Sequence, residues 1–235
     1  MLLLFDIDAT LITTSRAGIT ALGLAGKDAF GPAFTIEGVD FAGRLDPLIV
    51  DDLLTRNDQL ISSSNRETLR TGYRIHLIRL LSQPGMGRPM VGVMPLLENL
   101  RADNHHTLGL LTGNFPETGR IKLRACGIEP DNFLIQVWGD ESPHNPPSRT
   151  HLAPIALERA GHRLRRPILG HEAIIIGDTP HDIRCAKSSG MRCLAVATGM
   201  FTVDQLQSMG ADRVVPDLSD TRAIVDYLSQ DTPAS

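Results

Sequence analysis

Short runs of apolar residues alternate along the chain with longer segments in which apolar residues recur every three or four positions. Apolar runs occupy 2–5 and 173–176, and a similar run that includes one glycine occupies 108–111. Runs of this length are typical of strands buried on both faces, and the periodic segments are typical of amphipathic helices. The alternation predicts strands at 2–5, 107–111, 133–137, 173–176, 193–197 and 212–215, and helices at 95–102, 117–125, 150–160, 180–189, 202–209 and 221–229. We therefore expect an α/β fold with a doubly wound, Rossmann-like parallel sheet.

The stretch between the first two predicted strands is far longer than a single crossover helix requires. Apolar spacing predicts helices at 14–30, from Asp46 onward and at 64–81, and a sequence rich in Pro and Gly, 83–89, ends the stretch. A structureless loop of this length would be unusual in a compact domain. We predict an α/β core formed by 1–13 and 90–235, and a small α-helical domain formed by 14–89 and inserted after the first strand.

Polar and acidic residues follow three of the predicted strands directly. Asp6 and Asp8 follow the first strand, the sequence Thr112-Gly113-Asn114 follows the second, and Asp178 and Asp182 follow the strand at 173–176. The carboxyl ends of parallel strands lie at one edge of a sheet, where ligands bind. Clustered carboxylates are stable around a divalent cation, or when one of them holds a proton. The sequence therefore predicts one site that contains Asp6, Asp8, Thr112, Asn114, Asp178 and Asp182.

This set of motifs resembles the haloacid dehalogenase-like hydrolase superfamily. The matching sequences are D-x-D-x-T from Asp6 to Thr10, Thr112 at a strand end, and G-D-x-x-x-D from Gly177 to Asp182. The segment Gly43-Arg44-Leu45-Asp46 resembles phosphoglycolate-phosphatase-like members, which have a helical cap. The resemblance implies that 14–89 is this cap domain and that 1–13 and 90–235 form the hydrolase core. Two positions depart from the family pattern. Arg149 stands where the family usually has a lysine before a helix, and Ala9 stands where many members have glycine, a change that a negative φ would accommodate.

The resemblance implies a Mg²⁺-dependent phosphatase that hydrolyses a small phosphomonoester through an aspartyl-phosphate intermediate. Asp6 would attack phosphorus, and Asp8 would protonate the leaving alkoxide and then accept a proton from water. Arg44 in the helical segment could meet a substrate anion. The phosphoryl group would be bound by Thr112, Gly113, Asn114 and Arg149. The Mg²⁺ ligands would be Asp6, Asp8 through its backbone carbonyl, Asp178 and, directly or through water, Asp182.

Several alternatives stay open beside the phosphatase. A sugar-phosphate mutase resembling β-phosphoglucomutase would use the same acids. A haloacid dehalogenase needs neither a metal nor a second acid, so Asp8 and the Asp178/Asp182 pair disfavour it. A phosphonate hydrolase would need a cap lysine for a Schiff base, and Lys27 is the one lysine in 14–89. A non-catalytic member that binds phosphate compounds or a protein is the remaining alternative.

The composition of the chain limits the classes of molecule that it is expected to bind. The net charge is -4 and no long basic run occurs, which disfavours binding to nucleic acid. The hydrophobic and charged fractions, 42% and 21%, are typical of globular proteins, and no apolar stretch has the length of a membrane span. The spacing of Cys126, Cys185 and Cys193 indicates neither a disulfide framework nor a metal site, so we expect reduced thiols and a cytoplasmic location. A monomer or weak homodimer that acts on a small molecule is expected.

Overall fold

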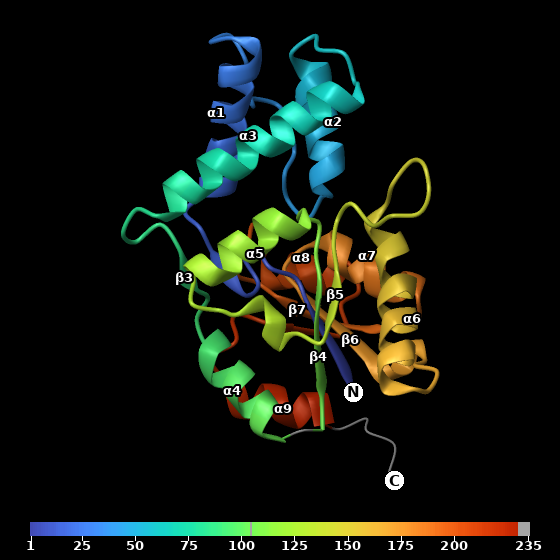
Figure 1. Ribbon diagram of the computed structural model, residues 1–235. Helices are drawn as coiled ribbons and strands as arrows, with labels where there is room; N and C mark the ends of the chain where they lie inside the picture. The colour runs from blue at the N-terminus through green and yellow to red at the C-terminus, as the bar shows by residue number, and fades with distance from the viewer. Residues whose placement is uncertain (104, 230–235) are drawn as a thin grey trace.

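A six-stranded parallel sheet forms the centre of the computed structural model, which describes residues 1–103 and 105–229. The strand order is β5-β4-β1-β6-β7-β8, so β1 lies between β4 and β6 (Figure 1). The bounds are β1 (Leu2–Phe5), β4 (Thr107–Leu111), β5 (Ile135–Val137), β6 (Ala173–Gly177), β7 (Arg192–Val196) and β8 (Arg213–Val215). The predicted α/β class and Rossmann-like sheet are confirmed. The three strands that precede the polar motifs are therefore direct neighbours.

Helices cover both faces of the sheet because the strand side chains alternate between two apolar layers. Leu3 and Phe5 of β1 face one layer, and Leu2 and Leu4 face the other. Helices α4 (Val93–Asp103), α5 (Pro116–Ala125) and α9 (Thr221–Ser229) contribute to the first layer. Helices α6 (Leu152–Leu164), α7 (Pro180–Ser188) and α8 (Val203–Ser208) contribute to the second. Each large side chain buried in these layers stabilises the fold by roughly 1.5–3 kcal/mol.

Short 3₁₀ turns account for most differences between the predicted and observed element ends. They are η1 (Pro130–Asn132), η2 (Arg149–His151) and η3 (Gly170–Glu172). The first delays the strand predicted at 133–137, which begins at Ile135. The second precedes the helix predicted at 150–160, which extends to Leu164. Such turns have no hydrophobic period by which a sequence could predict them.

The segment between β1 and α4 is mostly helical, and we call residues 14–89 the helical insert. It contains α1 (Ala17–Phe30), α2 (Asp46–Arg56) and α3 (Ser63–Leu81), which lie together at one end of the molecule (Figure 1). These helices share an apolar core of their own around Leu22, Leu53 and Leu77. The two ends of the insert are joined by an antiparallel pair that the sequence did not predict, β2 (Ile12–Thr13) with β3 (Arg88–Pro89). The division into two domains stays a prediction.

Contacts between the insert and the sheet domain combine apolar and ionic groups. The ring of Phe115, just before α5, is buried in the core of the insert. The guanidinium of Arg70 on α3 lies 4.0 Å from the centre of that ring. The same group donates to Glu117 Oε2 at 2.8 Å and pairs with Asp140 at 2.9 Å. In this structure α3 therefore packs directly over the start of α5.

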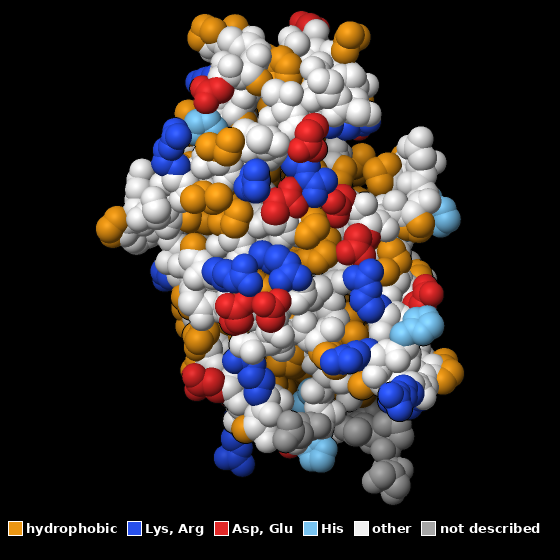
Figure 2. All heavy atoms as spheres, viewed as in Figure 1, with side chains coloured by type: hydrophobic (Ala, Val, Ile, Leu, Met, Phe, Trp, Pro, Cys, Tyr) orange, Lys and Arg blue, Asp and Glu red, His pale blue; other side chains and the backbone are white. Residues whose placement is uncertain are grey.

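The surface shows no extended region of one charge on the face drawn in Figure 2, where Lys and Arg side chains lie beside Asp and Glu. None of the described helices combines the length and the hydropathy that a membrane crossing requires. The three cysteines are buried free thiols, as their spacing indicated.

The backbone at Ala9 lies in the left-handed region, with φ of 58°. The negative φ that would accommodate an alanine is therefore absent. The Ala9 N–H donates to Ile12 O at 2.8 Å, and the Ala9 carbonyl accepts a hydrogen bond from the Thr198 hydroxyl. These contacts hold the turn between Asp8 and β2 in a conformation that favours glycine.

We expect Ala9→Gly to raise the free energy of unfolding by about 0.5–1 kcal/mol, because relief of the left-handed strain exceeds the entropic cost of glycine. Urea denaturation measures this change. Ala102→Gly, in the exposed part of α4, is the matched control and should lower stability by about 1 kcal/mol. Equal losses in the two variants would contradict strain at Ala9.

Candidate active site

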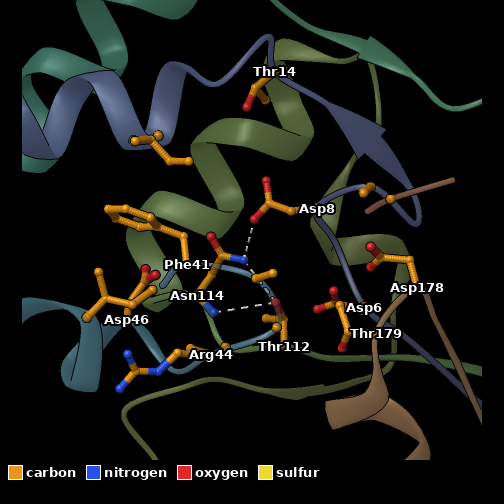
Figure 3. A pocket seen from close by; sticks show the side chains of 18 of the residues that line it. Asp6, Asp8, Thr14, Phe41, Arg44, Asp46, Thr112, Asn114, Asp178 and Thr179 are labelled. Atoms are coloured by element: carbon orange, nitrogen blue, oxygen red, sulfur yellow. Dashed lines mark hydrogen bonds between the residues drawn. The ribbon is translucent and has the colours of Figure 1, made fainter. Parts of the chain in front are cut away.

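The carboxyl ends of β1, β4 and β6 open into a cavity of about 510 Å³ that the helical insert covers. Asp6 and Asp8 follow β1, Thr112 and Asn114 follow β4, and Asp178 follows β6, and all five line the cavity. Figure 3 shows Asp6, Asp178 and Thr179 close together, with Asp8, Asn114 and Thr112 beside them. The structure thus brings together the side chains that the strand-end motifs indicated.

Asp6, Asp178 and Asp182 form a buried carboxylate cluster, with one oxygen from each lying within 4.8 Å of the others. Asp178 accepts a hydrogen bond from Thr10 at 3.3 Å, and Asp182 accepts one from the Thr179 hydroxyl at 2.7 Å. Burial raises the pKa of Asp6 to about 6, with the charge of Asp182 adding to the effect and Arg149 opposing it. Burial and the neighbouring carboxylates also raise the pKa of Asp178 well above its ordinary value. The cluster therefore has an excess of negative charge.

Arg149 is the buried cation of this cluster. From η2 its Nη2 atom lies 2.9 Å from Asp6 Oδ1 and also donates to Asp182, and its Nη1 atom donates to the carbonyl of Gly43 at 3.0 Å. Burial alone would lower the pKa of Arg149, but Asp182 and Asp6 outweigh burial and raise it. The guanidinium therefore stays charged and joins two of the strand-end acids to the helical insert. The structure thus places Arg149 against the acids of the cluster, and its catalytic role stays a prediction.

The donor set fits a divalent cation. Three buried carboxylates supply hard oxygen ligands. Among the described residues, Arg149 is the one positively charged side chain that contacts them. Two of these acids have raised pKa values, which a cation would relieve. The side chain of Asp8 lies outside the cluster, so its predicted share in metal binding rests on its backbone carbonyl.

Asp8 instead belongs to a second polar network, which includes a residue that the sequence did not single out. Its Oδ2 atom accepts hydrogen bonds from Lys122 Nζ at 2.7 Å and from Asn114 Nδ2 at 2.9 Å. Lys122 also donates to Asn114 Oδ1 at 2.6 Å, and Asn114 donates to Thr112 Oγ1 at 2.9 Å (Figure 3 shows the Asn114 contacts). The Lys122 side chain is only 6% exposed, whereas that of Asp8 is 45% exposed. The buried Lys122 therefore holds the carboxylate of Asp8 where it is exposed to the cavity.

Lys122 lies on α5 one turn after Thr118 and beside Leu123, on the buried face of the helix. A lysine in that position is unusual, since lysine is almost never buried unless it is paired, and this signal could have identified it. Burial would lower the pKa of Lys122, but Asp8, Tyr73 and Asp46 outweigh burial and raise it. Tyr73 belongs to α3, so Lys122 also stands at the junction of the insert and the core.

Asp46, at the start of α2, meets the loop after β4. Its Oδ2 atom accepts hydrogen bonds from the Phe115 N–H at 2.8 Å and from the Thr118 hydroxyl at 3.4 Å. Its own N–H donates to Gly113 O at 2.7 Å. Burial raises the pKa of Asp46 to about 6, although Lys122 and the Phe115 N–H oppose the shift. A carboxylate of the insert is therefore buried against the core.

Gly113 and Arg44 meet through backbone atoms. A Cβ atom at Gly113 would lie 2.0 Å from the carbonyl oxygen of Arg44, so only glycine fits there. The Arg44 guanidinium is ion-paired with Asp52 and donates to Asp40 O at 3.4 Å. In Figure 3 it lies on the opposite side of the view from Asp6. A substrate anion at Arg44 stays a prediction, and such an anion would compete with Asp52.

Comparisons with known proteins agree with these motifs. A family model described as HAD-hydrolase-like matches residues 150–221. The pyrophosphatase PpaX of Bacillus pumilus is 24% identical over 237 residues, covering 94% of each chain. Two solved structures share the fold. A hydrolase from Pseudomonas syringae has a TM-score of 0.74 and 22% identity, covering 96% of this chain and 98% of that one. A predicted phosphoglycolate phosphatase from Haemophilus somnus has a TM-score of 0.72 and 19% identity, covering 95% and 97%.

Asp46→Asn should become more favourable to stability as the pH rises. Because the pKa of Asp46 increases from 3.8 to about 6 on folding, the unfolded chain ionises first and the folded state loses stability between these values. Above them the penalty is about 2–3 kcal/mol. Asparagine avoids it while keeping an oxygen that accepts from Phe115 N–H.

Urea unfolding at about pH 4 and about pH 8 measures this difference between the variant and the wild type. The exposed Asp226 on α9 offers the matched substitution, Asp226→Asn. If the difference in free energy of unfolding between Asp46→Asn and the wild type is the same at both pH values, the pKa of Asp46 is not raised by folding.

Proposed function

We propose that this chain, whose motifs and matches are those of haloacid dehalogenase-like hydrolases, is a Mg²⁺-dependent phosphatase that hydrolyses a small phosphomonoester through an aspartyl-phosphate on Asp6. One observation carries the proposal: Asp6, Asp178, Asp182 and Arg149 converge where β1 and β6 end, beside the half-exposed Asp8. Phosphoryl transfer depends mainly on positioning and on balance of charge. The cavity supplies both around Asp6.

Asp6 is the proposed nucleophile. Its Oδ1 atom is paired with Arg149, which orients the carboxylate and reduces its repulsion of an incoming phosphoryl group. Asp182 pairs with the same Nη2 nitrogen and so helps to hold the guanidinium in place. Attack by a carboxylate oxygen of Asp6 on phosphorus breaks the ester bond and forms the aspartyl-phosphate, which water then hydrolyses.

Asp6, Asp178 and Asp182 would hold the Mg²⁺ ion, together with the backbone carbonyl of Asp8. When bound, the ion would withdraw negative charge from the phosphoryl oxygens and from the carboxylates. The hydroxyl of Thr10 keeps Asp178 oriented, and Thr179 does the same for Asp182.

Asp8 is the proposed general acid and base. Lys122 and Asn114 both bind its Oδ2 atom, and no contact to Oδ1 is found among the described residues. That second oxygen faces the cavity and is available to give a proton to the leaving oxygen, and later to take one from water. Lys122 is the proposed positioning residue, since its Nζ atom binds Asp8 and Asn114 and its side chain is only 6% exposed.

Thr112, Gly113, Asn114 and Arg149 are the proposed phosphoryl-binding residues. The Thr112 oxygen accepts a hydrogen bond from the side chain of Asn114, which leaves the Thr112 O–H free to donate to a phosphoryl oxygen. The loop from Thr112 leads into α5, so its backbone N–H groups lie at a helix start that favours anions.

Hydrolysis of p-nitrophenyl phosphate tests the proposed chemistry. We expect release of p-nitrophenol with Mg²⁺, loss of release with EDTA, and a loss of at least roughly 10³-fold in kcat for Asp6→Asn, because the amide cannot attack phosphorus. Asp226→Asn should keep full activity. Full activity of Asp6→Asn would exclude Asp6 as the nucleophile. Phosphate transfer between sugar phosphates without net release would favour the mutase.

Lys122→Met should lower kcat by roughly 10–100-fold, because a displaced general acid loses part of its usual contribution of about 10²–10⁴. KM should change little, since Lys122 does not reach the phosphoryl group. Lys122→Arg should recover part of the rate, and Lys187→Met, on the exposed side of α7, should have no effect. Circular dichroism separates a catalytic loss from unfolding. A loss confined to KM would contradict the positioning role.

A further inference from the structure

The lining of the cavity differs sharply between its two sides. The sheet side supplies Asp6, Asp8, Asp178 and the loop after β4. The insert side supplies apolar side chains from α1, from the loop before α2 and from α2 itself, namely Ile19, Leu22, Val39, Phe41 and Ile49. In Figure 3 the ring of Phe41 lies on the side of the view away from Asp6 and Asp178. We infer that the substrate has a single phosphoryl group and an uncharged, largely apolar leaving group, an inference that rests on the proposed function.

The size of the cavity leaves room for such a leaving group. Its volume of about 510 Å³ lies within the range of about 300–1,000 Å³ that is typical of sites for small organic molecules. One phosphoryl group at Asp6 occupies only the end of this space. The remainder is bordered by the apolar side chains of the insert, which favour an apolar leaving group because its binding removes apolar surface from water.

The described cations that line the cavity leave no buried, unpaired positive charge for a second phosphoryl group. Four cationic side chains line it, and three of them already have acidic partners: Arg149 with Asp6 and Asp182, Lys122 with Asp8, and Arg44 with Asp52. The fourth is Arg16, for which no ion pair is found in the described part of the chain. Because Arg16 is exposed, water and salt weaken its attraction for an anion.

Acidic residues of the insert oppose a second phosphoryl group. Asp40 and Asp46, both from the insert, also line the cavity. A second phosphoryl group there would have to be taken from water without a matching buried cation, which is costly. The distribution of charge therefore disfavours bisphosphates and pyrophosphate, and the apolar wall disfavours leaving groups with many hydroxyls.

Three substrates with matched chain length test this inference in the presence of Mg²⁺: n-butyl phosphate, 1,4-butanediol bisphosphate and erythritol 4-phosphate. They share a four-carbon leaving group and differ only in a second phosphoryl group or in hydroxyls. We expect kcat/KM to be at least tenfold higher for n-butyl phosphate than for either of the others. Equal or higher kcat/KM for the bisphosphate or the polyol would overturn the inference and leave the phosphatase intact. Absence of turnover for all three and for p-nitrophenyl phosphate would instead contradict the proposed function.

Ile19→Lys supplies a sharper test, because it places a cation in the apolar wall without touching the proposed catalytic residues. We expect it to raise kcat/KM for 1,4-butanediol bisphosphate relative to n-butyl phosphate by tenfold or more. Ile75→Lys adds the same charge at an exposed position on α3 and should leave the ratio unchanged. An unchanged ratio in a folded Ile19→Lys variant would show that the apolar wall does not contact the leaving group.

Discussion

The buried pairing of Arg149 with Asp6 and Asp182 is the interaction on which the rest of the site depends. The carboxylates after β1 and β6 are buried, and buried charges are costly unless an opposite charge lies against them. Arg149 satisfies two of them at once and stays ionised under their influence. Its planar head also reaches Gly43, which an ammonium group on a shorter side chain could do only by giving up one of the acids.

A second buried cation extends the same principle to the other half of the site. Lys122 balances Asp8 on the sheet side and interacts with Tyr73 and Asp46 from the insert. Each of the two cations thus pairs with acids of the core and brings parts of the insert against them. Phe115 adds an apolar anchor at the same boundary, because its ring belongs to the core of the insert. Charge balance and packing therefore hold the insert over the strand ends together.

The sequence was sufficient to predict the sheet and the side chains at the strand ends, because continuous apolar runs mark buried parallel strands and such strands place their carboxyl ends together. It was also sufficient to place Arg149, which precedes a predicted helix. It did not reveal Lys122, whose importance depends on which face of α5 is buried. The conformation of Ala9 and the pairing of β2 with β3 depend on tertiary contacts and leave no period in the sequence. The ion pair of Arg44 with Asp52 was missed because it too depends on how the chain folds locally and leaves no pattern in the sequence.

The loop with Gly43 and Arg44, together with the start of α2 at Asp46, meets the core through several backbone atoms beside the Asp46 carboxylate. The Gly43 carbonyl binds Arg149, the Asp46 N–H binds Gly113, and the Arg44 carbonyl packs against Gly113. Backbone atoms are common to all residue types, so this attachment does not depend on the side chains that neighbouring positions of the loop present to the cavity. Selection can therefore exchange those side chains, and with them the accepted leaving group, while the docking of the loop and the chemistry beneath it are inherited unchanged.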